Sequence, residues 1–176
     1  MLRLPHFEGK PVNIIWQHEL RAYRGRLHSG EGPGEQVHAA SFLRKRELVL
    51  DTSLKQDSIE LARILTHEMF HFVWWRLGNP TRLEWQALIE NEFARGAAGE
   101  LGWSAEARKK RLSVEDRHDR TKLWRDYICE SFCDTAAWIY SGVHEHEEFT
   151  LKPRFRTLRR RWFEQLTSHH GGALRI

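Results

Sequence analysis

The segment from Leu61 to Leu77 constrains the fold of this chain more than any other. It is apolar on nearly every side, yet it carries His67, Glu68 and His71 in the pattern H-E-x-x-H. On a helix, residues four positions apart share a face, so both imidazoles can reach one metal ion. Glu68 lies about 100° around the helix from His67, beside the metal-facing side. Polar groups buried among apolar side chains need partners, so the segment predicts a buried helix that holds a metal.

Signals at both ends limit this metal helix to about residues 57–77. Asp57 and Glu60 form a D-x-x-E capping box before the apolar run. Gly78 follows the run as the expected C′ residue, and Pro80 cannot continue the helix. These signals disfavour the simpler interpretation, in which the two histidines and the glutamate are core groups satisfied by hydrogen bonds.

Composition predicts a single domain over residues 1–176, a length that can bury a core. No apolar run reaches the ~18 residues of a membrane span, and the N-terminus lacks the apolar segment of a secretory signal. We therefore expect a cytoplasmic protein without a membrane partner. Cys129 and Cys133 are four positions apart, which suggests neither a disulfide framework nor a cysteine-based zinc site. We expect both to be small core residues in a reducing compartment.

The pattern before the metal helix predicts a small, mainly antiparallel sheet within about residues 10–52. Residues 12–16 are rich in β-branched and aromatic side chains and predict the first strand. Two further runs, 37–43 and 47–51, are separated by Arg-Lys-Arg and predict a hairpin. The second of these runs contains three consecutive apolar residues, so we expect it to be buried on both faces.

The pattern after the metal helix is helical, which makes the fold class α+β. Thr81 and Glu84 predict a second capping box, at the start of a helix that reaches about Arg95. Apolar spacing then predicts a long helix over about 121–141. A basic amphipathic helix over about 153–167 completes the chain.

A catalytic zinc site needs a third protein ligand, and Glu130 is the strongest candidate. It lies among apolar residues on the helix over 121–141, where an unpaired carboxylate would be costly. Asp134, one turn later, can accept the ring N–H of His67 and so fix its tautomer. The alternative for Glu130 and Asp134 is an acid pair on the helix surface. The other candidates for the third ligand lie too near in sequence or in polar segments: Glu90, Glu92, His118, His144 and His146.

The combination of His67-Glu68-x-x-His71 with a later Glu130-x-x-x-Asp134 resembles the gluzincin branch of the zincin metallopeptidases. The resemblance is confined to the metal helix and the Glu130 helix. It implies a zincin-like fold, in which a small sheet lies over the metal helix and an edge strand lines the substrate cleft. The hairpin over 37–51 would supply that edge.

These residues predict a hydrolase, a zinc metallopeptidase that cleaves peptide or protein substrates. One zinc ion would be held by His67, His71 and Glu130, with Glu68 as general base toward the zinc-bound water and then as proton donor to the leaving amine. The sequence identifies no His or Tyr that stabilises the transition state. One alternative is therefore a peptidase-like zinc domain that cleaves little and serves regulation or partner binding. Another is a protease acting on nucleoprotein, as in the SprT-like zincins.

The chain is mildly basic, with a formal net charge of +4, which permits contact with nucleic acid without requiring it. Between residues 152 and 161 there are six basic residues and no acidic one. No pattern of base-stacking aromatic residues accompanies this run, so a solvated helix face is favoured over a nucleic-acid site. The sequence does not give the oligomeric state.

Overall fold

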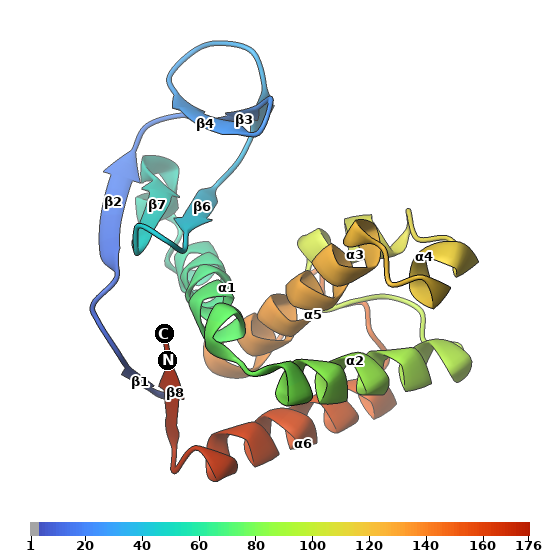
Figure 1. Cartoon of the computed structure of the whole chain (residues 1–176). Helices are drawn as coiled ribbons and strands as arrows, with labels where there is room; N and C mark the ends of the chain where they lie inside the picture. Colours follow the sequence, from blue (N-terminus) through green and yellow to red (C-terminus); the bar gives the residue numbers. More distant parts are fainter. Residues whose placement is uncertain (1–3) are drawn as a thin grey trace.

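The structure is a computed structural model that describes residues 4–176, and it has the α+β class predicted from the sequence (Figure 1). The strands are β1 (His6–Glu8), β2 (Asn13–Gln17), β3 (Leu20–Tyr23), β4 (Arg26–Ser29), β5 (Glu35–Gln36), β6 (Ala39–Phe42), β7 (Glu47–Asp51) and β8 (Ala173–Arg175). The helices are the short 3-10 helix η1 (Thr52–Gln56), α1 (Ser58–Arg76), α2 (Asn79–Ala94), α3 (Trp103–Lys109), α4 (Val114–His118), α5 (Lys122–Tyr140) and α6 (Pro153–His169). Within residues 4–176, no helix has both the length and the apolar character needed to cross a bilayer.

The sheet beside α1 has the strand order β2-β7-β6. β6 and β7 form the predicted hairpin, with Ala40 opposite Val49 in an antiparallel register. β2 pairs with β7 in parallel, because the chain leaves β2 for a separate sheet of order β4-β3-β5 before it returns. The predicted single, mainly antiparallel sheet is therefore met only in part: residues 10–52 form two sheets, and the one beside α1 has one parallel and one antiparallel pair. The apolar centre of β7 is buried, as predicted.

The start of α1 follows the predicted cap only in part. The Asp57 carboxylate accepts hydrogen bonds from the backbone N–H groups of Ile59 and Glu60. The side chain of Glu60 does not complete the box, because it binds Arg63 and His146 instead. One half of the capping box therefore suffices to begin the helix at Ser58.

The end of α1 agrees with the predicted bounds, because the helix ends at Arg76, but Gly78 has a second role. Leu77 is the C-cap of α1, and Gly78, predicted to be the C′ residue, is the N-cap of α2 with φ −67°. Pro80 lies in the first turn of α2, where a missing N–H costs nothing. The capping box predicted from Thr81 is wrong, because α2 already begins at Asn79 and has no side-chain cap.

Aromatic side chains fill the contact between α1 and the helices that surround it. The ring of Phe70 on α1 stacks on Tyr140 of α5 and meets Phe163 of α6. Trp85 of α2 packs against Phe163, and its indole N–H donates to the carbonyl of Ile128 at 3.2 Å. These packed rings fix how α1 crosses α5, and that crossing positions the candidate site.

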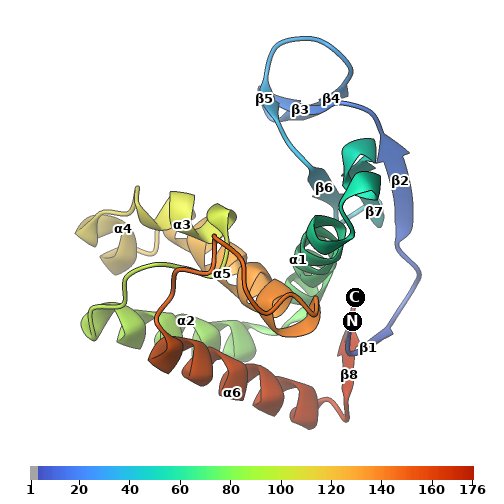
Figure 2. The same ribbon diagram turned by 180° about the vertical axis from the view of Figure 1, so that it is seen from behind.

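The two ends of the described chain meet beside α1. β1 pairs with β8 in parallel, and the backbone N–H of Ile176 donates to the carbonyl of Glu8 at 2.9 Å. The views from the front and from behind both place the two ends side by side (Figures 1 and 2). β8 in turn contacts α1, so the pair covers one side of the metal helix.

The basic helix α6 is not the uniformly solvated face that was expected. Arg159 is fully buried, and its guanidinium lies 2.7 Å from a carboxylate oxygen of Glu92 and 2.8 Å from one of Glu100. The guanidinium of Arg160 packs on the ring of Trp138. Arg161 is exposed. Nothing in the basic segment 152–161 of the sequence distinguishes Arg159, which points inward, from its neighbours.

Replacing Arg159 by Ala should destabilise the protein by about 3–5 kcal/mol, because the buried Glu92 loses its counter-charge and the buried Glu100 keeps only Lys109. The midpoint of urea unfolding measures this loss. Arg161→Ala on the exposed face of the same helix is the matched control and should change stability by no more than about 0.5 kcal/mol. Equal midpoints for the two variants would contradict the assigned role of Arg159.

Candidate metal centre

Three donor atoms from α1 and α5 converge on one point. His67 Nε2 lies 3.2 Å from His71 Nε2 and 3.2 Å from Glu130 Oε2. His71 Nε2 lies 3.9 Å from the same oxygen of Glu130. Ligands of a tetrahedral zinc ion with bonds of about 2.0–2.1 Å are about 3.3 Å apart, so the three atoms fit such an ion.

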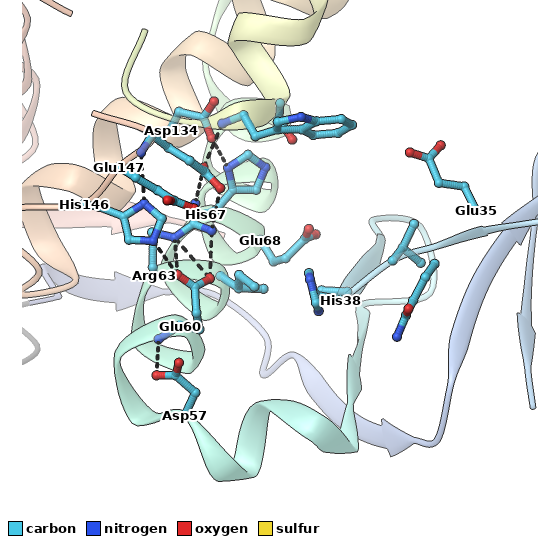
Figure 3. A pocket seen from close by; sticks show the side chains of 17 residues that line it. Glu35, His38, Asp57, Glu60, Arg63, His67, Glu68, Asp134, His146 and Glu147 are labelled. Atoms are coloured by element: carbon cyan, nitrogen blue, oxygen red, sulfur yellow. Dashed lines mark hydrogen bonds and ion pairs between the residues drawn. The ribbon is translucent and has the colours of Figure 1, made fainter. Parts of the chain in front are cut away.

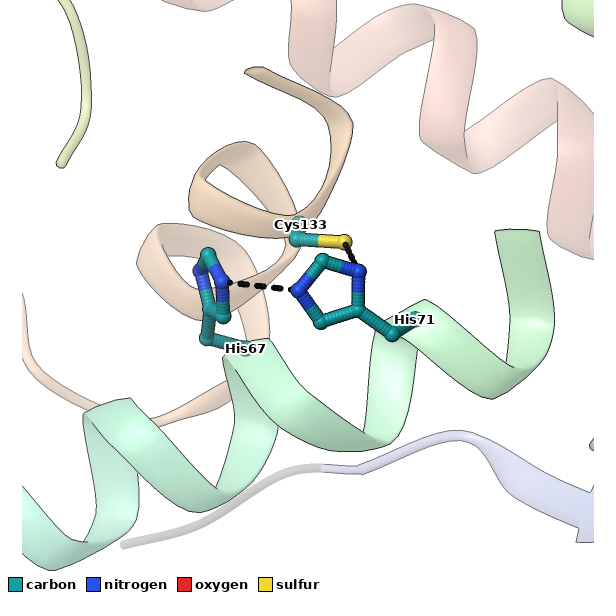
Figure 4. Close-up of side chains that lie close together, drawn as sticks. All are labelled: His67, His71 and Cys133. Carbon is teal, nitrogen blue, oxygen red and sulfur yellow. Dashed lines mark hydrogen bonds between the residues drawn. The ribbon is translucent and has the colours of Figure 1, made fainter. Parts of the chain in front are cut away.

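Cys133 is an alternative third ligand. This differs from the sequence-based prediction, in which the spacing of Cys129 and Cys133 suggested no cysteine-based zinc site. His67, His71 and Cys133 form a group, with donor atoms within 4.8 Å of one another, that could hold a metal ion (Figure 4). Cys133 Sγ, however, lies 3.4 Å from Nδ1 of His71, on the far side of the ring from Nε2. Glu130 fits better beside the two histidines, because its oxygen faces the Nε2 atoms of both.

Asp134 holds the ring of His67. Its Oδ1 accepts a hydrogen bond from His67 Nδ1 at 2.7 Å, which leaves the Nε2 lone pair free for a metal. Its Oδ2 accepts the backbone N–H of Ala105 at 2.9 Å. Gly102 packs so closely that a Cβ there would lie 2.3 Å from Asp134 Cγ. The carboxylate is therefore held on two sides, by α1 and by the start of α3.

Arg108 of α3 orients the carboxylate of Glu130. Its Nη2 lies 3.0 Å from Oε1, so Oε2 is the oxygen presented to the two imidazoles. Arg108 was not predicted from the sequence, where it is one of four consecutive basic residues at positions 108–111.

The electrostatics of the site favour added positive charge. Burial opposes protonation of His67, but the carboxylates of Asp134 and Glu130 outweigh it and raise the pKa of His67 well above its usual value. For His71, burial is again outweighed, by the Cys129 thiol and Glu130, and the pKa rises to about 9. Burial would raise the pKa of Glu130, but its hydrogen bond with His67 and the nearby cations lower it to about 2. Protons or a metal cation can supply the charge that the acids demand.

His67 and Glu68 line a cleft of about 690 Å³ whose other walls include the residues leading into β6 and the loop around His146. Figure 3 shows Glu68 on the cleft side of α1, between His67 and His38. The hydroxyl of Ser41 on β6 donates to Glu68 Oε2 at 2.5 Å. Glu68 thus faces the cleft without joining the three converging donors. Ser41 was missed in the sequence because its contact depends on how β6 packs against α1.

The remaining ligand candidates have other contacts or positions. His146 lies in the cleft wall, with Nε2 2.7 Å from the carboxylate of Glu60. The others are ion-paired elsewhere or exposed: Glu90, Glu92, His118 and His144.

A comparison of the chain with protein-family models, with curated proteins and with solved structures finds no match.

Gly102→Ala should lower the affinity for zinc by about 10–100-fold, because the added Cβ displaces the carboxylate that holds His67. Asp134→Ala should lower it to a similar extent. Competition with a chromophoric chelator measures the affinity. Gly78→Ala is the control, since a Cβ there meets only Pro80 Cδ at 3.6 Å and should leave zinc binding unchanged. A Gly102→Ala protein with wild-type affinity would show that Asp134 does not set the geometry of His67.

Proposed function

We propose that the protein is a zinc-dependent metallopeptidase with a zincin-like fold. The observation that carries the proposal is the convergence of His67, His71 and Glu130 beside a cleft that Glu68 also lines. These three residues would hold one zinc ion. When bound there, zinc supplies Lewis-acid chemistry that polarises water and the substrate carbonyl.

The other steps of peptide hydrolysis would be carried out by side chains of the protein. Glu68 accepts the proton of the attacking water and passes it to the leaving amine. Ser41 occupies Oε2 of Glu68, which leaves Oε1 to take the proton. Asp134 keeps the proton of His67 on Nδ1, and Arg108 keeps Glu130 turned toward the imidazoles. His38 and His146 are the cleft-wall imidazoles from which a group that stabilises the transition state would come.

The shape of the cleft supports an extended peptide as the substrate. One wall is formed by the residues that lead into β6, and β6 is the edge strand of the β2-β7-β6 sheet. In the described part of the chain, the outer side of β6 pairs with no strand. An exposed edge strand can hydrogen-bond to the backbone of a peptide laid beside it, whatever the peptide's side chains.

The structure supplies less support for a protease that acts on nucleoprotein. Of the basic residues in α6, Arg159 is buried and Arg160 packs on Trp138, so the run offers fewer free charges than its sequence suggests. Phosphate binding depends on the number of cations that reach the backbone of the nucleic acid. We therefore propose a peptide or protein substrate without nucleic acid.

The purified protein should hold one zinc ion per chain, and Glu130→Ala should lose most of it. Elemental analysis after gel filtration without chelator gives the stoichiometry. Glu90→Ala is a matched control, because Glu90 lies outside the converging donors and contacts Gln86 and Arg120. If the Glu130→Ala protein still holds one zinc ion per chain, then Cys133 and not Glu130 is the third ligand.

Glu68→Gln should keep the zinc while hydrolysis of a denatured protein pool falls by about 10²–10⁴-fold, because the amide cannot take the proton. Appearance of new peptide N-termini measures the rate. A variant that cleaves as fast as wild type would refute the mechanism. Wild-type protein that holds zinc and cleaves nothing would favour the non-cleaving zinc domain.

A further inference from the structure

The imidazole of His71 has a second ring nitrogen, Nδ1, that the proposed peptidase chemistry does not use. Opposite Nε2, its Nδ1 lies 3.5 Å from Cys129 Sγ and 3.4 Å from Cys133 Sγ. Residues four apart on a helix share a face, so both thiols of α5 point to the same nitrogen on α1. These are the chain's two cysteines, and neither forms a disulfide.

Two cysteine sulfurs share one ring nitrogen here. Thiols are poor donors and poor acceptors, and Nδ1 can exchange only one hydrogen bond. His67 contrasts with this, because its own Nδ1 is held by the carboxylate of Asp134 at 2.7 Å. A bound ion that contacts both sulfur atoms and Nδ1 at once would stabilise this arrangement more than one hydrogen bond does.

We propose that Cys129, Cys133 and Nδ1 of His71 form a binding site for a soft, thiophilic metal ion. Bonds of the lengths that zinc forms, about 2.3 Å to sulfur and 2.0–2.1 Å to nitrogen, place the two atoms about 3.5 Å apart around a tetrahedral ion. The observed separations of 3.5 and 3.4 Å match this value. Two sulfur donors with one imidazole select soft ions such as Cu⁺ or Cd²⁺ over hard ones.

Occupation of this site changes the chemistry of His71. As the two metal–sulfur bonds form, any proton still carried by a thiol passes to solvent. Ligation through Nδ1 leaves the one proton of the neutral imidazole on Nε2, which then has no lone pair to offer zinc. The soft ion and the zinc ion thus compete for the same ring. Cys129 is only partly buried and gives the ion access from solvent.

The proposal differs in two ligands from the group of His67, His71 and Cys133. That group uses one sulfur and needs His67, whereas the site proposed here uses two sulfurs and does not need His67. Cys129→Ala and His67→Ala therefore separate the two arrangements.

The test is a titration of the metal-free protein with Cd²⁺, read by the ultraviolet charge-transfer absorbance of cadmium–thiolate bonds. Wild type should bind one Cd²⁺ per chain with full absorbance. Cys129→Ala should lower the absorbance per bound ion to about half and weaken binding, and Cys133→Ala should do the same. His67→Ala and Glu130→Ala should keep the full signal. Circular dichroism of each variant confirms that it is folded.

Any one of four results would overturn the proposal. Absorbance unchanged by Cys129→Ala, or lost in His67→Ala, would assign the ion to His67, His71 and Cys133. Absence of the absorbance in wild type would show that the thiols take no soft ion. A doubling of the mass in gel filtration on adding Cd²⁺ would show that the ion bridges two chains instead. None of these readouts requires peptidase activity, so a failure of the proposed function leaves the test intact.

Discussion

The carboxylate of Asp134 joins three helices at one buried point. It binds the ring of His67 on α1 and the backbone N–H of Ala105 on α3, while its own backbone belongs to α5. A buried carboxylate is costly unless charge or hydrogen bonds compensate it, so these partners must stay together in the folded state. The absence of a side chain at Gly102 makes the approach of α3 feasible. The position of the first metal-site histidine is thus fixed by the same contact that docks α3.

Two buried clusters of charge lie in the helical half, and they are balanced differently. Around Arg159, the carboxylates of Glu92 and Glu100 meet the guanidinium and the ammonium of Lys109, and every charge has a partner within the chain. At the candidate metal centre, Glu130 has Arg108, but the imidazoles beside it carry positive charge only when protonated. The charges of the first cluster compensate one another without any added ion. The acids of the second are compensated only when protons or a cation are added.

Features that lie within one helix could be predicted from the sequence. The spacing of His67 and His71 gave a shared face, and the cap at Asp57 gave the start of α1 to within a residue. Glu130 was inferred from the cost of burying an acid, and the crossing of α1 and α5 brings it to the imidazoles. The start of α2 was misjudged, because a glycine after one helix can also begin the next, as Gly78 does.

Contacts between elements left no local signal. Ser41, Gly102 and Arg108 reach the site only because β6 and α3 pack where they do. Arg159 could not be distinguished from its basic neighbours, because its acidic partners lie on α2 and in the loop that follows it. The contacts of the two cysteines with His71 were missed for the same reason: their spacing on α5 gives their direction but not the residue they face.

The pairing of β1 with β8 bears on the order in which the metal helix acquires its surroundings. Segments from opposite ends of the described chain can pair only after the long intervening chain has closed, and that closure costs entropy before the new contacts repay it. The strand that covers one side of α1 therefore arrives late in folding. The candidate ligands on α1 and α5 are nearer to each other in sequence and can meet first, so the donor atoms can come together while this side of the helix is still open to water.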